Sequence, residues 1–176
     1  MMYRKTYSSP IGLLEMESDG TYLTGLSQSS TNHDTDWIEK DLPIFESTSH
    51  WLDIYFAGKI PDFTPKYKVL NATPFRKQVI DIICRIPYGK VVTYKDIADQ
   101  IARSRGLKRM PAQAVGGAVG WNPICIIIPC HRVVGSTGNL TGYAGGIDKK
   151  VRLLEIENHL VSEFKIKKNE EKSYLI

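Results

Sequence analysis

The hydrophobic pattern of the chain changes near residue 70, and this change limits the possible folds more than any other feature of the sequence. Before it, two short segments rich in Leu, Met, Thr and Tyr flank Asp19-Gly20, a dipeptide typical of two-residue hairpin turns. A helix is expected over 46–57, where apolar residues share one helical face. We therefore predict antiparallel sheet plus one helix, followed by a linker over 61–72.

After this point the pattern is helical. Thr73-Pro74 has the residue types favoured at a helix start, and apolar residues then recur on one face. Thr93, with Asp96 three residues later, predicts the start of a second helix, which ends at Arg105-Gly106. The second part of the chain is therefore predicted to be mainly helical.

A third helix is indicated after Pro111, in a segment made almost entirely of Ala, Gly and Val. Two adjacent glycines, Gly116 and Gly117, each cost roughly 1 kcal/mol of helix propensity relative to Ala. Either this segment is not a helix, or a partner must approach its backbone closely. A short buried strand is expected over 124–128, a last helix over 148–158, and a poorly ordered segment after it.

Composition excludes several classes of protein. With 176 residues, 42% of them hydrophobic and 24% charged, the chain is expected to form one globular domain or two small ones. It has no signal-peptide pattern and no apolar run near the roughly 20 residues of a membrane span. We therefore expect a cytoplasmic protein without membrane contact.

The charge is distributed unevenly. Residues 1–70 contain 6 Lys and Arg against 10 Asp and Glu, a net charge of −4, whereas residues 71–176 contain 17 against 9, a net charge of +8. This asymmetry favours an anionic partner for the second part. Four basic residues fall in the turn between the second and third helices, where phosphates would contact a helix-turn-helix, although a solvated basic loop explains them equally well: Arg103, Arg105, Lys108 and Arg109.

The three cysteines, Cys84, Cys125 and Cys130, are an odd number and form no C-x-x-C pair, which argues against a disulfide framework and a four-ligand metal site. His33 and His50 stand in a part without cysteine, so we assign no metal. Cys84 on an amphipathic helix and Cys125 in an apolar strand are predicted to be packing residues.

Cys130 follows the predicted strand and Pro129, so we expect it on a rigid mount, which suits a nucleophile. The next residue is His131. A Cys-His pair alone is weak evidence, because neighbouring side chains often point apart and thiols are often inert core residues.

A longer pattern around Cys130 is more specific. Pro129-Cys130-His131-Arg132-Val133, with Asn122-Pro123 upstream and Gly142-Tyr143-Ala144-Gly145-Gly146 downstream, resembles the O6-alkylguanine-DNA alkyltransferase family over residues 73–158. The first part resembles it only loosely, through Ser9-Pro10-Ile11-Gly12 and the hairpin.

The resemblance implies two domains and a tail. The first is an α/β, RNase H-like N-terminal domain (1–70), with an antiparallel sheet plus helix. The second is a mainly helical DNA-binding and alkyl-transfer domain (71–160), with a winged-helix-like helix-turn-helix. A polar C-terminal tail (161–176) follows.

The resemblance also implies the chemistry. Cys130 would accept the alkyl group, His131 would take its proton through a water, and Glu157 would orient the histidine. A free thiol has a pKa of about 8.5, so such a triad is needed to raise the thiolate fraction at neutral pH. Tyr94 would donate to the leaving guanine oxygen, and Asn122 would brace the turn that holds the cysteine.

A guanine flipped out of the duplex, at a cost of a few kcal/mol, would occupy the pocket of such a protein. The resemblance implies that the Ala144 N–H contacts O6 and that the carbonyls of Cys130 and Val133 accept from the guanine amino group. Tyr143 and Gly145 would line the same pocket.

The resemblance further implies that the small-residue helix enters the minor groove, where small side chains permit close approach without sequence reading. The residues expected to contact DNA are Thr93, Tyr94, Arg109, Ala112, Gln113, Ala114, Gly116 and Gly117. Gln113 departs from the family pattern, because many relatives have an arginine that fills the space left by the flipped nucleotide. We expect weaker base flipping rather than lost chemistry.

The sequence therefore predicts a monomeric suicide enzyme that repairs double-stranded DNA by moving the alkyl group of O6-alkylguanine to Cys130, with no cofactor and no metal. O4-alkylthymine is a further candidate substrate. Two alternatives remain open: a non-catalytic damage sensor, of the kind that lacks the acceptor cysteine, and a cysteine hydrolase. A hydrolase would need neither the basic helix-turn-helix nor the small-residue helix.

Overall fold

The computed structural model describes residues 1–29 and 37–166, which form two compact units. The first unit comprises residues 1–71 together with 123–127, and the second comprises 72–122 and the chain from 128 onward. None of the described helices combines the length and the apolar character that a membrane span needs.

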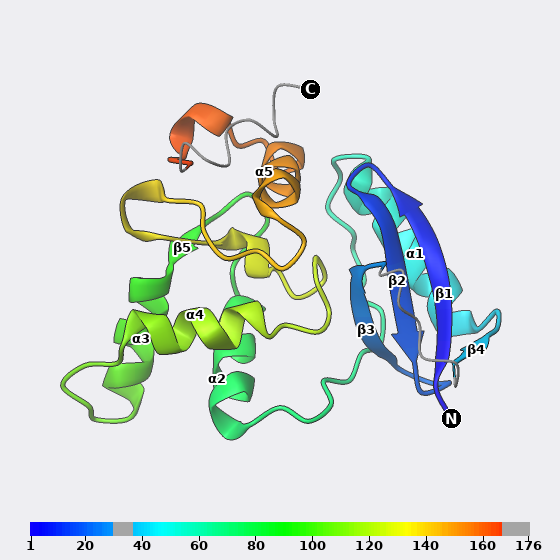
Figure 1. Cartoon of the computed structure of the whole chain (residues 1–176), viewed down its shortest axis with the longest axis horizontal. Coiled ribbons are helices and arrows are strands. Elements are labelled where there is room, and N and C mark those ends of the chain that lie inside the picture. The colour runs from blue at the N-terminus through cyan, green and yellow to red at the C-terminus, as the bar shows by residue number, and fades with distance from the viewer. Residues whose placement is uncertain (30–36, 167–176) are drawn as a thin grey trace. The chain divides into compact units, whose positions relative to one another are not determined.

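The first unit contains a four-stranded sheet in the order β3-β2-β1-β4 (Figure 1). Its strands are β1 (Tyr3–Ser9), β2 (Gly12–Ser18), β3 (Leu23–Gln28) and β4 (Ile38–Glu39). The predicted hairpin is confirmed as the antiparallel pair of β2 and β3. The sheet is not purely antiparallel, because β4 pairs with β1 in parallel.

The turn between β2 and β3 follows from Asp19-Gly20. The Asp19 carboxylate accepts hydrogen bonds from the Thr21 and Tyr22 N–H groups at 2.9 and 2.8 Å, and Gly20 has a φ of +101°. Glycine adopts this backbone conformation without the steric cost that a side chain would add.

Helix α1 (Pro43–Phe56) covers the sheet and begins three residues before the predicted start, with Pro43 in its first turn. Its buried residues Phe45, Leu52 and Tyr55 form a core with the inward side chains of β2 and β3. The segment 61–72 is not a free linker. Leu23 on β3 donates to the Lys66 carbonyl and accepts from the Lys68 N–H, both at 2.9 Å, so this segment extends the sheet.

Residues 124–128 are not the predicted strand. Ile124 bridges Leu26 on β3, where the Leu26 N–H donates to the Pro123 carbonyl at 2.9 Å and the Cys125 N–H donates to the Leu26 carbonyl at 2.8 Å. Ile126 then has a φ of +71°, which ends the extended backbone. A β-branched residue rarely adopts this conformation, so the continuous apolar run over 124–128 could not predict it.

The second unit is mainly helical, as predicted. It contains α2 (Pro74–Ile83), α3 (Tyr94–Ser104), α4 (Ala112–Gly120) and α5 (Ile147–Ile156), and a short parallel pair, β5 (Val92–Thr93) with β6 (Val133–Val134). The predicted caps are present. The Thr73 side chain accepts from the Arg76 N–H, and Thr93 with Asp96 forms a reciprocal capping box.

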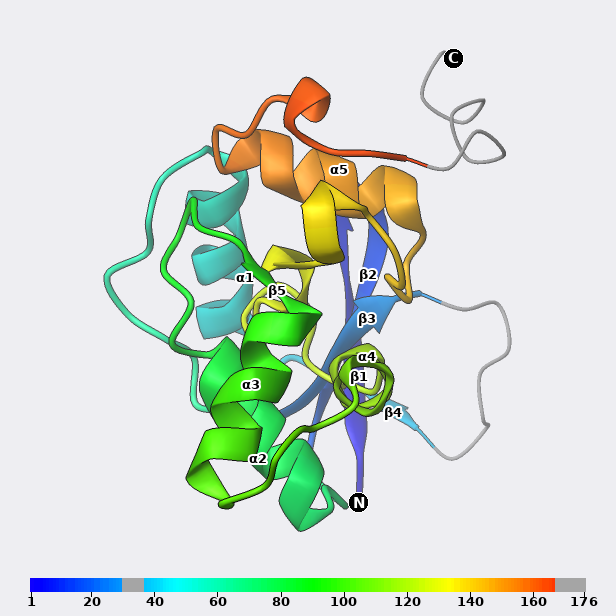
Figure 2. The ribbon, with the colours of Figure 1, turned by 90° about the vertical axis from the view of Figure 1, so that its left-hand side faces the viewer.

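The small-residue segment after Pro111 is a helix despite its glycines. Val115, Ala118 and Val119 are buried, and α4 contacts both α2 and α3, as the end-on view of α4 in Figure 2 shows. Ala112, Gln113, Ala114 and Gly117 are exposed on its other side. Tertiary packing of one apolar face therefore outweighs the low helix propensity.

The chain after Asn158 is ordered further than predicted. A 3₁₀ turn spans Val161–Glu163, and Phe164 and Ile166 pack against the cluster of Val134, Leu140, Val151 and Leu154. Residues 161–166 of the predicted tail are thus part of the second unit, and 167–176 lie outside the described residues.

Candidate active site

The acceptor candidate Cys130 opens a 3₁₀ turn, Cys130–Arg132, in the second unit. This turn leads directly into β6, which pairs with β5, and β5 leads directly into α3. The parallel pair therefore brings the start of α3 beside the cysteine turn. The Asn122 side chain donates to the Ile128 carbonyl at 2.8 Å and braces the approach to the turn. Cys130 itself is 6% exposed.

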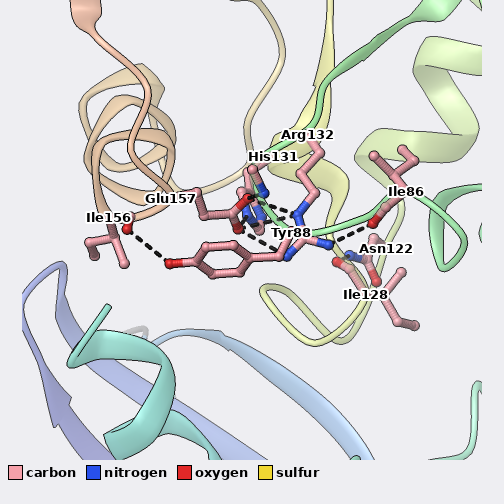
Figure 3. A network of polar contacts seen from close by, with 9 residues as sticks. Ile86, Tyr88, Asn122, Ile128, His131, Arg132, Ile156 and Glu157 are labelled. Atoms are coloured by element: carbon pink, nitrogen blue, oxygen red, sulfur yellow. Dashed lines mark hydrogen bonds and ion pairs between the residues drawn. The ribbon is translucent and has the colours of Figure 1, made fainter. Parts of the chain in front are cut away.

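His131, the residue after Cys130, lies in direct contact with Glu157 (Figure 3). The His131 Nε2 is 2.6 Å from the Glu157 Oε1, and both side chains are fully buried. Glu157 occupies the C-cap position of α5, so the last helix delivers the carboxylate to the turn that carries Cys130. The family resemblance predicted the roles of His131 and Glu157, but it gave no distance between their side chains.

Arg132 is a further member of this network that the sequence reading left without a role. Its Nε donates to the Glu157 Oε2 at 2.9 Å and its Nη2 to Oε1 at 3.0 Å, while its Nη1 donates to the Ile86 carbonyl at 2.7 Å. The Gly89 N–H also donates to Glu157, at 3.0 Å. The Tyr88 hydroxyl donates to the Ile156 carbonyl at 2.9 Å, so the 86–89 segment is tied to the end of α5 (Figure 3).

These contacts fix the charges of the pair. Burial opposes ionisation of Glu157, but the hydrogen bonds and charges of His131 and Arg132 outweigh it and lower its pKa to about 2. Burial also lowers the pKa of His131, against the opposing effect of Glu157. At neutral pH the site therefore holds a carboxylate and a neutral imidazole. With its Nε2–H directed at Glu157, the imidazole has its basic lone pair on Nδ1.

Tyr94, the first residue of α3, donates from its hydroxyl to the Thr141 carbonyl at 3.1 Å. Burial raises the pKa of Tyr94, the hydrogen bond with Thr141 lowers it, and the charge of Cys130 raises it again. Tyr94 therefore stays protonated at neutral pH, as a hydrogen-bond donor within the electrostatic reach of Cys130.

Lys150 on α5 is a second site residue that the sequence reading missed. It is fully buried, and its Nζ donates to the Val133 carbonyl at 2.6 Å and to the Thr141 carbonyl at 3.0 Å. Burial lowers its pKa to about 8, against the charge of Cys130, which raises it. One signal in the sequence could have found it: Lys150 falls three residues after Ile147 and four before Leu154, on the apolar face of the last helix.

A cavity of about 560 Å³ opens beside Tyr94, between the first turns of α3 and α4 and the loop after β6. Five of the residues that line it were predicted to bind DNA, namely Tyr94, Ala112, Gln113, Gly116 and Gly117. The remaining walls are Lys95, Gly135, Ser136, Thr141 and Gly142. Of these, the sequence analysis had named only Gly142, as part of the family pattern, because small residues such as Gly135, Ser136 and Thr141 carry no distinctive chemistry.

Several predicted residues lie outside these walls. Cys130, Val133, Tyr143, Ala144 and Gly145 do not line the cavity, whereas Tyr94, which does, interacts electrostatically with Cys130. Thr93 acts as the N-cap of α3, while Arg109 and Ala114 are exposed, before and on α4 respectively.

The other cysteines and the histidines form no metal centre among the described residues. Cys84 is exposed at the C-cap of α2, so its prediction as a packing residue is wrong. Cys125 is half-buried in the first unit. His50 stacks on Phe63 with ring centroids 5.7 Å apart, and His33 lies outside the described residues.

Comparison with known proteins places both units. Residues 74–159 match the family model described as 6-O-methylguanine DNA methyltransferase, DNA binding domain, and residues 2–66 match its ribonuclease-like domain. The chain is 41% identical over 160 residues to a methylated-DNA–protein-cysteine methyltransferase of Mycobacterium bovis, covering 89% of this chain and 93% of that protein. A protein of the same name from Methanosarcina barkeri is 40% identical over 162 residues, covering 90% and 98%.

Among solved structures, the chain resembles the crystal structure of Mycobacterium tuberculosis OGT in complex with DNA. The two share 40% sequence identity with a TM-score of 0.77, covering 92% of this chain and 94% of that one. The observed fold is thus a ribonuclease-like sheet domain followed by a DNA-binding domain with helices.

Proposed function

The chain belongs to the 6-O-methylguanine DNA methyltransferase family, and from this premise we propose that it repairs DNA by transferring an alkyl group from O6-alkylguanine to Cys130. The observation that carries the assignment to this residue is the convergence of Cys130, His131 and Glu157 at one buried turn. O4-alkylthymine is a second candidate substrate, because it also bears an alkyl group on an exocyclic oxygen.

The transfer is an in-line displacement. The Cys130 thiol gives its proton through a water to the Nδ1 of His131, whose Nε2 is held by Glu157 at 2.6 Å. The thiolate sulfur forms a bond to the alkyl carbon as the C–O6 bond breaks, and the bonding electron pair remains on O6. No group in this scheme cleaves the resulting thioether, so each molecule acts once.

The leaving oxygen needs a donor as its charge develops. Tyr94 fits this role, because its hydroxyl stays protonated and interacts electrostatically with Cys130. The Ala144 N–H would add a second hydrogen bond to O6. The Cys130 and Val133 carbonyls would accept from the guanine amino group, and Tyr143 and Gly145 would close around the ring.

The lesion reaches this site as an extruded nucleotide, because a stacked base does not expose O6 to a protein thiol. The cavity beside Tyr94 is its entry, and the exposed small residues of α4 form the rim. Helices α3 and α4 would act as a winged-helix-like helix-turn-helix with α4 in the minor groove, where Ala and Gly permit close approach. Gln113 would insert in place of the flipped base.

The proposed functions are divided between the two parts of the chain. We assign residues 1–70 to an RNase H-like domain, 71–160 to DNA binding and transfer, and 161–176 to a C-terminal extension. The protein would act as a monomer in the cytoplasm, wherever the DNA is, because a single chain supplies the acceptor, the base and the groove-facing helix.

Mass measurement tests the proposal directly. Incubation with a duplex that contains one O6-methylguanine should add one methyl group per protein molecule, located on the Cys130 peptide, and should leave guanine in the DNA. Cys130→Ala should abolish the mass change, while Cys125→Ala, a matched control in the first unit, should not. Tight binding without a mass change would instead indicate a damage sensor and would overturn the transfer proposal.

A further inference from the structure

Lys150 is a buried charge to which the transfer scheme above gives no role. Lysine is almost never fully buried unless it is paired, because the ammonium loses its hydration. Lys150 has no exposed surface, and its Nζ donates to two main-chain carbonyl oxygens, at 2.6 and 3.0 Å. Retaining such a group costs stability, which calls for a function other than packing.

The two carbonyls belong to two different parts of the site. Val133 directly follows the Cys130–Arg132 turn, whereas Thr141 lies in the wall of the cavity beside Tyr94. Through these two hydrogen bonds, Lys150 ties the turn that carries the acceptor to the wall against which the substrate would rest. The distance between these parts is therefore set by one side chain from α5.

Tyr94 converges on the same point. Its hydroxyl donates to the Thr141 carbonyl at 3.1 Å, and its ring centroid lies 5.8 Å from the Lys150 Nζ. A Tyr94 hydroxyl that turns toward the leaving O6 must release the Thr141 carbonyl. Lys150 remains bonded to that carbonyl, so the release does not leave the half-buried Thr141 oxygen without a hydrogen bond.

Charge adds to this arrangement. During the transfer, negative charge moves from the Cys130 sulfur to O6, and a fixed cation nearby stabilises it throughout. The Lys150 ammonium and the Cys130 thiolate interact, and this interaction works against the lowering of the Lys150 pKa by burial. The same ammonium contributes to the lowered pKa of His131, which keeps the imidazole neutral and able to accept the thiol proton.

We propose that Lys150 is a positioning residue of the alkyl transfer, which holds the Val133 and Thr141 carbonyls in place while the Tyr94 hydroxyl turns from Thr141 to the leaving oxygen. This inference rests on the proposed function and adds to it a residue that acts through Tyr94 and the two carbonyls.

Replacement by an apolar side chain of similar length tests the inference. Lys150→Met should slow transfer from a methylated duplex by about 100-fold, the size of effect expected when a reacting group is displaced by about 1 Å. Affinity for the same duplex, measured in a Cys130→Ala background, should be unchanged. DNA binding is assigned to the exposed face of α4 and to the basic segment before it, which Lys150 does not contact. Lys150→Arg, which keeps a cation and several donors, should recover part of the rate.

The pH dependence separates positioning from a merely structural role. The titratable groups that interact with Lys150 are Cys130 and His131 on the 3₁₀ turn and Tyr94 on α3. The pKa of Tyr94 is raised above its ordinary value of 10, mainly by burial, so Tyr94 keeps its proton near pH 8. The wild-type rate should therefore fall above about pH 8 as Lys150 loses its proton, and this fall should be missing in Lys150→Met.

Controls keep the two proposals apart. Arg152→Met removes an exposed cation from the same helix and should transfer at the wild-type rate, and thermal unfolding should show Lys150→Met to be folded. Wild-type transfer combined with an equal rate and pH profile in Lys150→Met would overturn the role of Lys150 alone. Absence of transfer by the wild type would overturn the proposed function itself.

Discussion

Glu157 is the residue at which three segments of the second unit meet. Its carboxylate accepts hydrogen bonds from His131, from Arg132 and from the Gly89 N–H, with its side chain fully buried. A buried carboxylate is tolerated only when it is paired and hydrogen-bonded in this way. The residue therefore supports the fold and the histidine at the same time, and the two roles can be separated by pH.

Glu157→Gln should lower the free energy of unfolding at pH 7 by about 3 kcal/mol, because it leaves the largely buried Arg132 guanidinium without its counter-charge. The folded-state pKa of Glu157, about 2, lies below the ordinary glutamate value of 4.5. Its ionisation therefore stabilises the fold fully above pH 4.5, and this contribution is lost as the pH falls toward 2. Denaturant unfolding should show a smaller difference between wild type and variant at pH 3 than at pH 7.

Glu155→Gln is the matched control for this measurement. Glu155 lies on the same helix but pairs with Arg152 at the surface, so its replacement should cost less than about 1 kcal/mol. An equal loss for both variants, or a Glu157→Gln loss that does not change with pH, would contradict the assigned charge of Glu157.

Individual site residues differ in how far the sequence could predict them. Cys130, His131 and Glu157 came from a family pattern, and the structure brings the last two within 2.6 Å. Arg132 and Lys150 were missed because their roles depend on which carbonyls and carboxylates fold against them, and sequence spacing contains no such information. Cys84 was wrongly predicted to pack, because its position at the C-cap turns it away from the apolar face of α2.

At the scale of elements, α4 is the helix whose sequence is least explained by internal packing. Within the described residues, a Cβ built on Gly117 would meet no atom within 4 Å, and one on Gly116 would reach only the Tyr94 ring, at 3.9 Å. Glycine is therefore not required there by the fold, although it costs roughly 1 kcal/mol of helix propensity. An external surface that approaches the helix explains both glycines, which agrees with α4 as the groove-facing element.

Gln113, in the first turn of α4, gives the prediction for this element. Gln113→Arg should speed transfer from duplex DNA by about tenfold, equivalent to roughly 1.4 kcal/mol of the flipping cost. Arginine adds a positive charge and more hydrogen-bond donors for the base left unpaired by flipping. Single-turnover rates measure this directly. On a single-stranded substrate, which needs no flipping, the two proteins should react equally. Equal rates on the duplex would show that Gln113 already fills the gap left by the flipped nucleotide.

Element boundaries were predictable where local chemistry sets them. The Thr73 and Thr93 caps start α2 and α3 as predicted, because a side-chain oxygen satisfies an otherwise unpaired N–H of the first turn. The failure at 124–128 is tertiary in origin. Hydrogen bonds with Leu26 pair residues 123–125 with β3 of the first unit. Ile126 then adopts a left-handed backbone conformation, which no local preference favours.

At the scale of the whole molecule, the charges and the chain connectivity point to unequal roles for the two units. Residues 1–70 carry a net charge of −4 and residues 71–176 a net charge of +8. The change in hydrophobic pattern near residue 70 predicts two parts, but not the return of 123–127 to the first unit, which depends on long-range pairing. The cysteine turn thus begins three residues after a segment anchored in the other unit.

This asymmetry predicts the salt dependence of DNA binding. Each phosphate contact by Lys or Arg contributes about 0.9 to the slope of log affinity against log salt. Arg109→Gln removes an exposed cation just before α4 and should reduce the magnitude of this slope by about 0.9 on any DNA sequence. Lys59→Gln, an exposed cation of the acidic first unit, should leave the slope unchanged. Titration of a fluorescent duplex at several salt concentrations measures both variants. Equal reductions in the two slopes would mean that the first unit also contacts phosphate, and the assignment of DNA binding to the second unit alone would then be wrong.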